Sequence, residues 1–305
     1  MSEAEPEVEQ TNERGRERPD LVALGQKRLS KLELWLLRFV RWTFEPGLVD
    51  HCIRACQRAI GSSWIHHCTK YLRHVYGLER LPPLAPEQSF LLVCNHRSFF
   101  DLYVVIGELV RRGLPQRIIF PVRANFFYTS PLGLFVNGVM SFFAMYPPIF
   151  RERSKAVLNL AGLDELTWLL RRGGVFAGLH PEGTRKRDDD PYTLLPAQRG
   201  VGRVIRDAQV PVIPVFINGL LNDLPEQVKS NFARTGRKIV VVFGKPVDFS
   251  DLLQAPSTPK THQAIADRAL EAVAALGAEE RSHRAELEAE AAVALTSPSR
   301  RSAPN

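Results

Sequence analysis

The apolar run Phe90-Leu91-Leu92-Val93-Cys94 leads directly into the polar stretch Asn95-His96-Arg97-Ser98-Phe99-Phe100-Asp101. A short, uninterrupted apolar run of this kind predicts a strand that is buried on both faces. Polar residues at its carboxyl end would then lie in the loop before the next helix. The two stretches together predict a central strand with a functional loop beside it.

Four further apolar runs are typical of buried strands, and helical patterns separate them. The runs are residues 117–122, 175–179, 210–217 and 238–243, and the helical patterns lie near residues 101–112, 153–172 and 199–208. This alternation favours an α/β fold with a mostly parallel central sheet flanked by helices, preceded by an N-terminal amphipathic helical segment. Catalytic groups should then lie beyond the carboxyl ends of the strands.

The composition of the segments outside these patterns predicts how the chain is divided. The first residues and the last twenty are polar or rich in Ala, Glu, Ser and Arg, and such segments bury too little apolar surface to become ordered. We therefore expect five parts. They are a disordered arm (1–28), an amphipathic helical membrane-interface segment (29–80), a catalytic domain (85–250), a C-terminal helix (258–283) and a disordered tail (284–305).

A capping box at Ser30 and Glu33 predicts the start of an amphipathic helix that runs to about residue 44. Its apolar positions include Trp35 and Trp42, and its Lys and Arg residues gather on a narrow stripe. Tryptophan beside a basic edge suits a lipid interface. A helix that packs on the catalytic domain explains the same periodicity, so both interpretations remain open.

Length, charge and cysteine content limit the possible environments. The chain has 305 residues with a net charge of +7, and residues 27–80 hold ten Lys/Arg against four Asp/Glu, which favours an anionic membrane surface as a partner. Four cysteines form no dense disulfide framework, no signal peptide is visible, and no apolar run approaches a membrane span of about 20 residues. We expect a protein on the cytoplasmic face of a membrane, peripheral or monotopic.

His96 and Asp101 are the residues most suited to proton transfer. A neutral imidazole can take a proton from a hydroxyl, and a carboxylate bonded to its other nitrogen stabilises the imidazolium that forms. No Gly-x-Ser-x-Gly nucleophile motif occurs in the chain. A substrate oxygen would then have to be the nucleophile, as in direct transfer of an acyl group from a thioester to a bound alcohol. Taken alone, a His and an Asp at this spacing are weak evidence, because chance pairs and surface polar groups show it as well.

A second polar stretch, His180-Pro181-Glu182-Gly183-Thr184-Arg185-Lys186-Arg187, follows the strand expected at residues 175–179. Glycine at a strand exit allows the backbone to approach a ligand, and an arginine can hold a phosphate through two parallel hydrogen bonds. The alternative is a solvated polar turn. Two such stretches at strand exits of one sheet favour a site.

Together, residues 95–101, residues 181–185 and the proline-containing run at 210–215 resemble the motifs of the glycerolipid acyltransferase superfamily, typified by 1-acylglycerol-3-phosphate acyltransferase. The resemblance covers about residues 85–250 and implies that His96 is the general base and Asp101 its partner. It also implies an acceptor or phosphate site. Its residues would be Glu182, Gly183, Thr184 and Arg185, with Arg151 or Arg153 from the less well matched stretch 149–153.

The resemblance implies transfer of a fatty acyl group from acyl-CoA or acyl carrier protein to the free hydroxyl of 1-acylglycerol 3-phosphate in phospholipid biosynthesis. Glycerol 3-phosphate or another lysolipid, such as a lyso-ornithine lipid, is the alternative acceptor. The reaction needs no cofactor and no metal. A hydrolase and a catalytically silent lipid-binding homologue are the rival classes. No nucleic-acid-binding module is present, so we expect no nucleic-acid partner.

The region before the catalytic domain also contains several potential metal ligands. They are His51, Cys52, Cys56, His66, His67, Cys68 and His74. Their spacing matches none of the usual zinc frameworks, so the sequence favours packing cysteines and surface histidines over a zinc site.

Overall fold

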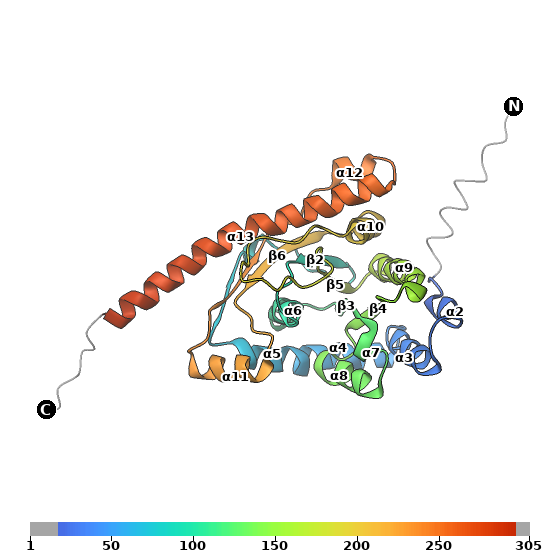
Figure 1. Ribbon diagram of the computed structural model, residues 1–305, viewed down its shortest axis with the longest axis horizontal. Coiled ribbons are helices and arrows are strands. Elements are labelled where there is room, and N and C mark those ends of the chain that lie inside the picture. The colour runs from blue at the N-terminus through green and yellow to red at the C-terminus, as the bar shows by residue number, and fades with distance from the viewer. Residues whose placement is uncertain (1–17, 297–305) are drawn as a thin grey trace.

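The computed structural model describes residues 18–296, which form a seven-stranded sheet between layers of helices (Figure 1). The sheet order is β1-β7-β6-β2-β5-β3-β4, and every neighbouring pair is parallel except β6–β7. The strands are β1 (Arg73–Tyr76), β2 (Phe90–Cys94), β3 (Arg117–Arg123), β4 (Met145–Ile149), β5 (Val175–Leu179), β6 (Val212–Asn218) and β7 (Ile239–Phe243). This confirms the predicted α/β fold with a mostly parallel sheet.

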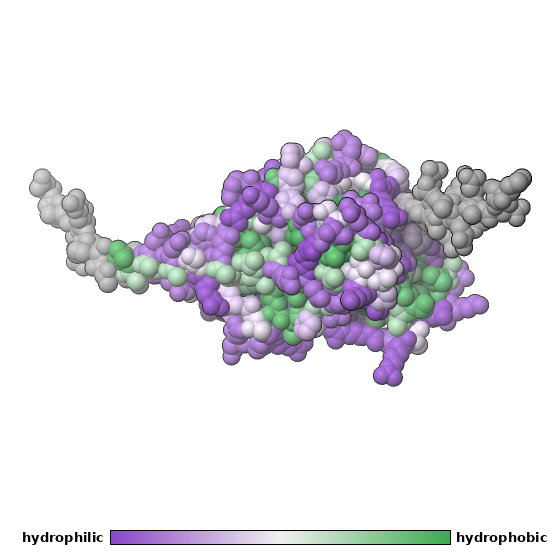
Figure 2. Space-filling model, turned by 90° about the horizontal axis from the view of Figure 1, so that it is seen from above, coloured by the Kyte–Doolittle hydropathy of each residue, from purple (hydrophilic) through white to green (hydrophobic). Residues whose placement is uncertain are grey.

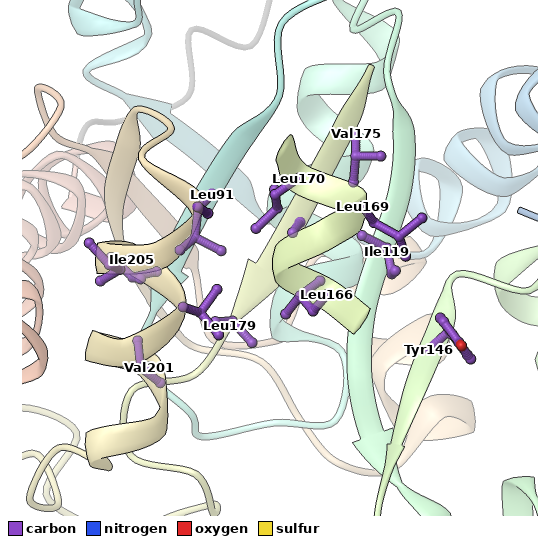
Figure 3. Close-up of a cluster of buried hydrophobic side chains, with 14 of the residues drawn as sticks. Leu91, Ile119, Tyr146, Leu166, Leu169, Leu170, Val175, Leu179, Val201 and Ile205 are labelled. Atoms are coloured by element: carbon purple, nitrogen blue, oxygen red, sulfur yellow. The ribbon is translucent and has the colours of Figure 1, made fainter. Parts of the chain in front are cut away.

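Helices cover both faces of the sheet because the central strands are apolar on both sides. On β2, Leu91 and Val93 face one core, whereas Phe90 and Leu92 face the other. The first core is closed by α9 (Val157–Arg172), α10 (Arg199–Ala208) and α13 (Pro259–Thr296). Figure 3 shows leucines of α9 and apolar residues of α10 meeting Leu91 over the sheet. The second core is closed by α5 (Ser62–Thr69) and α6 (Asp101–Arg111).

The two edge strands do not appear among the apolar runs of the sequence. β4 contains Pro147 and Pro148, which lack backbone N–H groups and are tolerated only at a sheet edge or a bulge. β1 is short and only partly buried, so it carries no strong pattern. Because β1 pairs with β7, residues 73–76 belong to the sheet. The predicted helical segment at 29–80 therefore extends too far.

The N-terminal helices are α2 (Leu21–Gly25), α3 (Lys31–Trp42), α4 (Leu48–Cys56), the π-helix η1 (Gln57–Gly61) and α5. The predicted capping box of α3 is present, with the side chains of Ser30 and Glu33 each bonded to the other residue's backbone N–H. Leu36, Leu37 and Val40 of α3 are fully or almost fully buried in the first core. The packing interpretation of this helix is thus confirmed for one of its faces.

Residues 18–28 are ordered against the catalytic domain, so the prediction of disorder up to residue 28 is wrong for this part. Arg18 Nε donates to Glu165 Oε1 over 2.7 Å, and the same oxygen accepts the hydroxyl of Tyr146 over 2.9 Å. Leu21 is fully buried. Residues 18–28 are thus held by an ion pair to a buried carboxylate and by one buried leucine. The polar composition of this segment does not indicate either contact. Residues 1–17 lie outside the described residues.

Helix α13 runs to Thr296, beyond the predicted boundary at residue 283. Ala and Glu are strong helix formers, and Arg284 donates to Glu280 Oε1 over 2.8 Å and to the Lys238 carbonyl over 3.0 Å. These contacts hold the helix to the sheet at a point where disorder was predicted, and its last turns project past the sheet (Figure 1). Residues 297–305 lie outside the described residues.

Shorter elements complete the chain. They are η2 (Leu78–Arg80), α7 (Ala124–Phe127), α8 (Pro131–Ser141), η3 (Arg153–Lys155), α11 (Leu224–Ala233) and α12 (Ser250–Gln254). None of the helices in residues 18–296 combines the length and the apolar character that crossing a membrane requires.

Candidate active site

Five neighbouring strands end at the same edge of the sheet, because β6, β2, β5, β3 and β4 pair in parallel. Ligands of open α/β sheets bind beyond the carboxyl ends of such strands. The polar residues that follow these strands are Asn222 after β6, His96 after β2, His180 after β5, Arg123 at the end of β3 and Arg151 after β4. They therefore gather at one edge.

His96 and Asp101 lie together, as the sequence predicts. The distance between His96 Nδ1 and Asp101 Oδ2 is 3.3 Å. A carboxylate only accepts hydrogen bonds, so this arrangement assigns the ring proton to Nδ1 and leaves Nε2 free to take a proton. Asp101 is almost fully buried, whereas the His96 side chain keeps 19% of its surface exposed. The imidazole is accessible and the carboxylate is not.

Backbone amides fix the carboxylate of Asp101. Its Oδ2 accepts the N–H groups of Arg97 and Ser98, each over 2.8 Å, at the first residue of α6. Burial raises the pKa of Asp101 to about 6, although nearby His180 and these two hydrogen bonds oppose the rise. Burial, followed by the charge of Arg185, lowers the pKa of His96 to about 3. At neutral pH the pair is therefore a neutral imidazole beside a carboxylate.

Glu182 holds the two polar loops together. Its Oε1 accepts the backbone N–H of His96 over 2.7 Å, and its Oε2 accepts that of Leu195 over 2.8 Å. The side chain is 1% exposed, and burial raises its pKa. Both oxygens are thus engaged with backbone amides, so Glu182 fixes the position of His96 in this structure. A direct contact between Glu182 and the acceptor stays a prediction.

Gly183 lies in a backbone conformation that only glycine adopts easily. Its φ is +64°, and a Cβ atom built on it would lie 2.7 Å from Gln198 Cγ. The glycine therefore permits the tight turn that leads from Glu182 to Thr184 and Arg185. The turn presents Thr184 at the surface, as the sequence predicts for a binding loop.

Arginines surround the loop that carries Thr184. Arg151 Nη2 donates to Thr184 Oγ1 over 3.2 Å, and Arg185 Nη1 donates to Asn222 Oδ1 over 2.7 Å. The pKa of Arg123 is lowered by burial and by the nearby charges of Arg151, Arg185 and Arg187. We call Arg123, Arg151, Arg185 and Arg187 the arginine cluster. Arg123 and Asn222 were not singled out in the sequence, because nothing local marks them.

The arginine cluster concentrates positive charge at the carboxyl edge of the sheet. Within residues 18–296, none of its four members forms an ion pair. Arg153 begins the short helix η3 and makes no contact with Thr184 or Asn222 in this part of the chain. The geometry therefore favours Arg151 over Arg153 as the second arginine of the predicted site.

His180 is a member of the site to which the sequence assigned no role. Its ring stacks on that of His96, with centroids 3.7 Å apart and planes 10° apart. Its Nδ1 lies 3.0 Å from the Cys94 carbonyl oxygen. The available signal was its place one residue beyond a buried strand that pairs with β2.

The donor atoms of His96, Asp101 and His180 lie within 4.8 Å of one another, a spacing that invites comparison with a metal site. The lone pairs of an imidazole lie in its ring plane, and the two rings are stacked almost parallel. One ion cannot lie in both ring planes, so the observed geometry suits stacking rather than chelation. The cysteines and histidines of residues 51–74 form no such group within the part of the chain that the structure describes.

Comparisons with known proteins relate the region that carries this site to acyltransferases. A family model described as Acyltransferase matches residues 73–218. Over this region the chain is similar to enzymes of the glycerolipid acyltransferase superfamily. Mouse 1-acyl-sn-glycerol-3-phosphate acyltransferase alpha is 27% identical over 195 residues, or 63% of this chain and 59% of that protein. The human beta enzyme is 29% identical over 174 residues, or 55% of each chain. The chain thus spans little more than half of these relatives.

A solved structure has the same fold. The crystal structure of the 1-acyl-sn-glycerophosphate (LPA) acyltransferase PlsC from Thermotoga maritima matches with a TM-score of 0.50 and 19% identity, covering 86% of this chain and 93% of that one. The region that the family model matches includes His96, Asp101, the whole arginine cluster and the 181–185 stretch. The N-terminal helices and α13 lie outside it.

Proposed function

We propose that the protein is an O-acyltransferase that moves a fatty acyl group from acyl-CoA or acyl carrier protein to the free hydroxyl of 1-acylglycerol 3-phosphate, giving phosphatidic acid. The proposal rests on the closeness of two groups of residues. The His96–Asp101 pair and the arginine cluster lie at the same edge of the sheet. This acceptor has a hydroxyl that must be deprotonated and a phosphate that must be bound.

The proposed reaction uses His96 as the base. Its Nε2 takes the proton of the acceptor hydroxyl while the hydroxyl oxygen forms a bond to the thioester carbonyl carbon. The carbon–sulfur bond then breaks, and the leaving thiolate takes the proton from His96. Asp101 stabilises the imidazolium between these steps, because its carboxylate lies 3.3 Å from Nδ1. The enzyme thus ends the cycle in its starting protonation state.

The arginine cluster is proposed to hold the acceptor phosphate. Guanidinium groups bind phosphate oxygens through paired hydrogen bonds, and these arginines have no acidic partner within residues 18–296. The charge of Arg185 helps to lower the pKa of His96, so this arginine lies near the base. An acceptor with a phosphate near its free hydroxyl would fit both groups at once.

We further propose that the protein lies on the cytoplasmic face of an anionic membrane through an apolar surface. Its residues are Trp35 and Trp42 of α3 with Leu132, Phe135 and Val139 of α8, all more than half exposed. A contact between Phe39 of α3 and Phe143, two residues beyond the end of α8, has ring centroids 5.4 Å apart and connects the two parts of this surface. The face seen in Figure 2, on the α13 side of the molecule, mixes hydrophilic residues with several hydrophobic patches.

Aromatic side chains link this apolar surface to the base. Phe99 lies between His96 and Asp101 in the sequence, and its ring stacks on Phe127 of α7, with centroids 6.1 Å apart. Helix α7 leads directly into α8. Acyl chains that leave the membrane at α8 would therefore reach the acyl-transfer site along apolar side chains.

The acceptor assignment can be tested with two acceptors that differ only in the phosphate. Detergent-solubilised protein is given labelled acyl-CoA with either lysophosphatidic acid or the corresponding monoacylglycerol. We expect strong preference for the phosphorylated acceptor, and Arg185→Ala should lower kcat/KM for it by about 10- to 100-fold, because hydrogen bonds between charged groups are lost. Arg153→Ala is the matched control and should change little.

Other outcomes would redirect the proposal. If Arg185→Ala raised the KM of the thioester rather than that of the acceptor, the cluster would bind the donor. Preference for glycerol 3-phosphate would change the acceptor but keep the reaction. Release of free fatty acid independent of any acceptor would identify a hydrolase instead.

Membrane binding has its own test. Phe135→Ser in the apolar surface should reduce co-sedimentation with anionic liposomes. Leu160→Ser, which changes a similarly exposed residue of α9, should not. Equal binding of both variants and the wild type would contradict the proposed orientation.

A further inference from the structure

Neither packing in the core nor exposure at the surface explains the position of His180. It follows β5, its ring covers one face of the His96 ring at 3.7 Å, and the two planes differ by 10°. His96 keeps 19% of its side chain exposed, so the stack covers the imidazole without closing it off. The contact is therefore directed at the group to which the reaction assigns proton transfer.

The backbone fixes the orientation of the His180 ring. Its Nδ1 lies 3.0 Å from the carbonyl oxygen of Cys94, the last residue of β2. A carbonyl only accepts, so Nδ1 carries the proton and His180 is held in one tautomer. Its anchor is thus the same strand that presents His96, and the two rings are positioned from a common backbone segment.

The bond to Asp101 alone restrains His96 only weakly. The 3.3 Å between His96 Nδ1 and Asp101 Oδ2 exceeds the usual length of an N–H···O hydrogen bond, which is about 2.9 Å. A backbone hydrogen bond from Ser98 also acts on the His96 side chain. The second side-chain torsion of histidine is broad, so these contacts at the ring edge define the ring plane only loosely. A second restraint perpendicular to the ring would define it, and a stacked neighbour supplies that restraint.

We propose that His180 is a positioning residue that holds the ring plane of His96 by stacking and so keeps Nε2 directed at the acceptor hydroxyl. The inference rests on the proposed function, in which His96 is the base. The charged and titratable groups near His96 are Asp101 from α6, Glu182 and Arg185 from the loop after β5, Arg123 from β3 and His180 itself. Of these, only His180 stacks on a face of the His96 ring, within the part of the chain that the structure describes.

Three substitutions separate the ring from its hydrogen bond. His180→Ala removes both, His180→Gln keeps an N–H donor for Cys94 but no ring, and His180→Phe keeps the ring but no donor. We expect the Ala and Gln variants to lose about 10- to 100-fold in kcat with little change in acceptor KM, because misplacing the base by about 1 Å has this effect. His180→Phe should recover most of the lost rate.

Different results would overturn the proposal. A fully active Gln variant beside an inactive Phe variant would assign the role to the hydrogen bond alone. A raised acceptor KM with unchanged kcat would make His180 a binding residue. Wild-type rates in all three variants would leave the stack without a function.

A titration without substrate separates this inference from the proposed function. The pKa of His96 is followed by NMR of the imidazole signals in the full-length protein, with His96→Gln used to assign the signal. Burial lowers this pKa, so His180→Ala should expose the ring face and raise it toward about 6.5, whereas His180→Phe should keep it low. Unchanged titration of His96 together with a wild-type kcat in His180→Ala refutes the positioning role even if His96 proves to be the base. Acyl transfer by His96→Ala would instead refute the proposed function.

Discussion

Replacing Asp101 by Asn removes a charge from the site with little change in shape. One oxygen, Oδ2, lies 3.3 Å from His96 Nδ1 and accepts the N–H groups of Arg97 and Ser98. The amide oxygen of Asn can take this place, whereas its NH₂ group would meet two N–H donors there. We therefore expect His96 to keep its tautomer and to lose only the stabilisation of its charged form.

The size of the effect follows from the geometry. Two unit charges 3.3 Å apart interact by about 5 kcal/mol at an effective dielectric constant of about 20. The positive charge is spread over the imidazolium ring, so the stabilisation that Asp101 supplies is smaller than this value. Its removal in the Asn variant should lower kcat by about 10²- to 10⁴-fold. The KM of the acceptor should change little, because Asp101 is buried away from solvent.

Stability measurements separate this loss from unfolding. Burial raises the pKa of Asp101, which means that the folded state disfavours its charged form and that this cost grows as pH rises from about 4 to 6. At pH 8 the Asn variant should therefore have a Tm at least equal to that of the wild type. Steady-state transfer to lysophosphatidic acid gives kcat, and an Asn variant within tenfold of the wild type would refute the role of the carboxylate.

Further predictions concern pH, the arginine cluster and the turn after Glu182. The rate should fall as pH drops through about 6, because the His96–Asp101 pair then gains a proton; a rate unchanged between pH 7 and pH 5 would contradict this. Arg123→Gln should raise the acceptor KM about tenfold, unlike Arg153→Gln, as measured by acceptor titration. Gly183→Ala should lower the free energy of unfolding by about 1–2 kcal/mol in urea denaturation, since its φ is +64° and its Cβ would meet Gln198.

The central strands were predictable because burial on both faces leaves a continuous apolar run, as at residues 90–94 and 175–179. Edge strands have no such pattern. β4 carries Pro147 and Pro148, and its place is set by pairing with β3. The order at residues 18–28 depends on Glu165, which lies more than a hundred residues away. Local pattern does not report such distant contacts.

The candidate site was predictable where the chemistry lies within one short stretch. His96 and Asp101 are five residues apart, and Gly183 and Arg185 share one turn. His180 and Arg123 escaped notice because their function depends on neighbours supplied by parallel strands: β2 beside β5, and β5 beside β3. An exposed arginine at the end of a strand looks the same in sequence whether or not other arginines face it.

The most direct test of the account is the rate of acyl transfer from labelled acyl-CoA to lysophosphatidic acid by the wild type and by His96→Ala, with Tm measured for both. The account predicts that the wild type forms phosphatidic acid, whereas the variant keeps its Tm and loses at least about 10²-fold in kcat, the usual contribution of a general base. A folded His96→Ala variant that transfers the acyl group at the wild-type rate would contradict it.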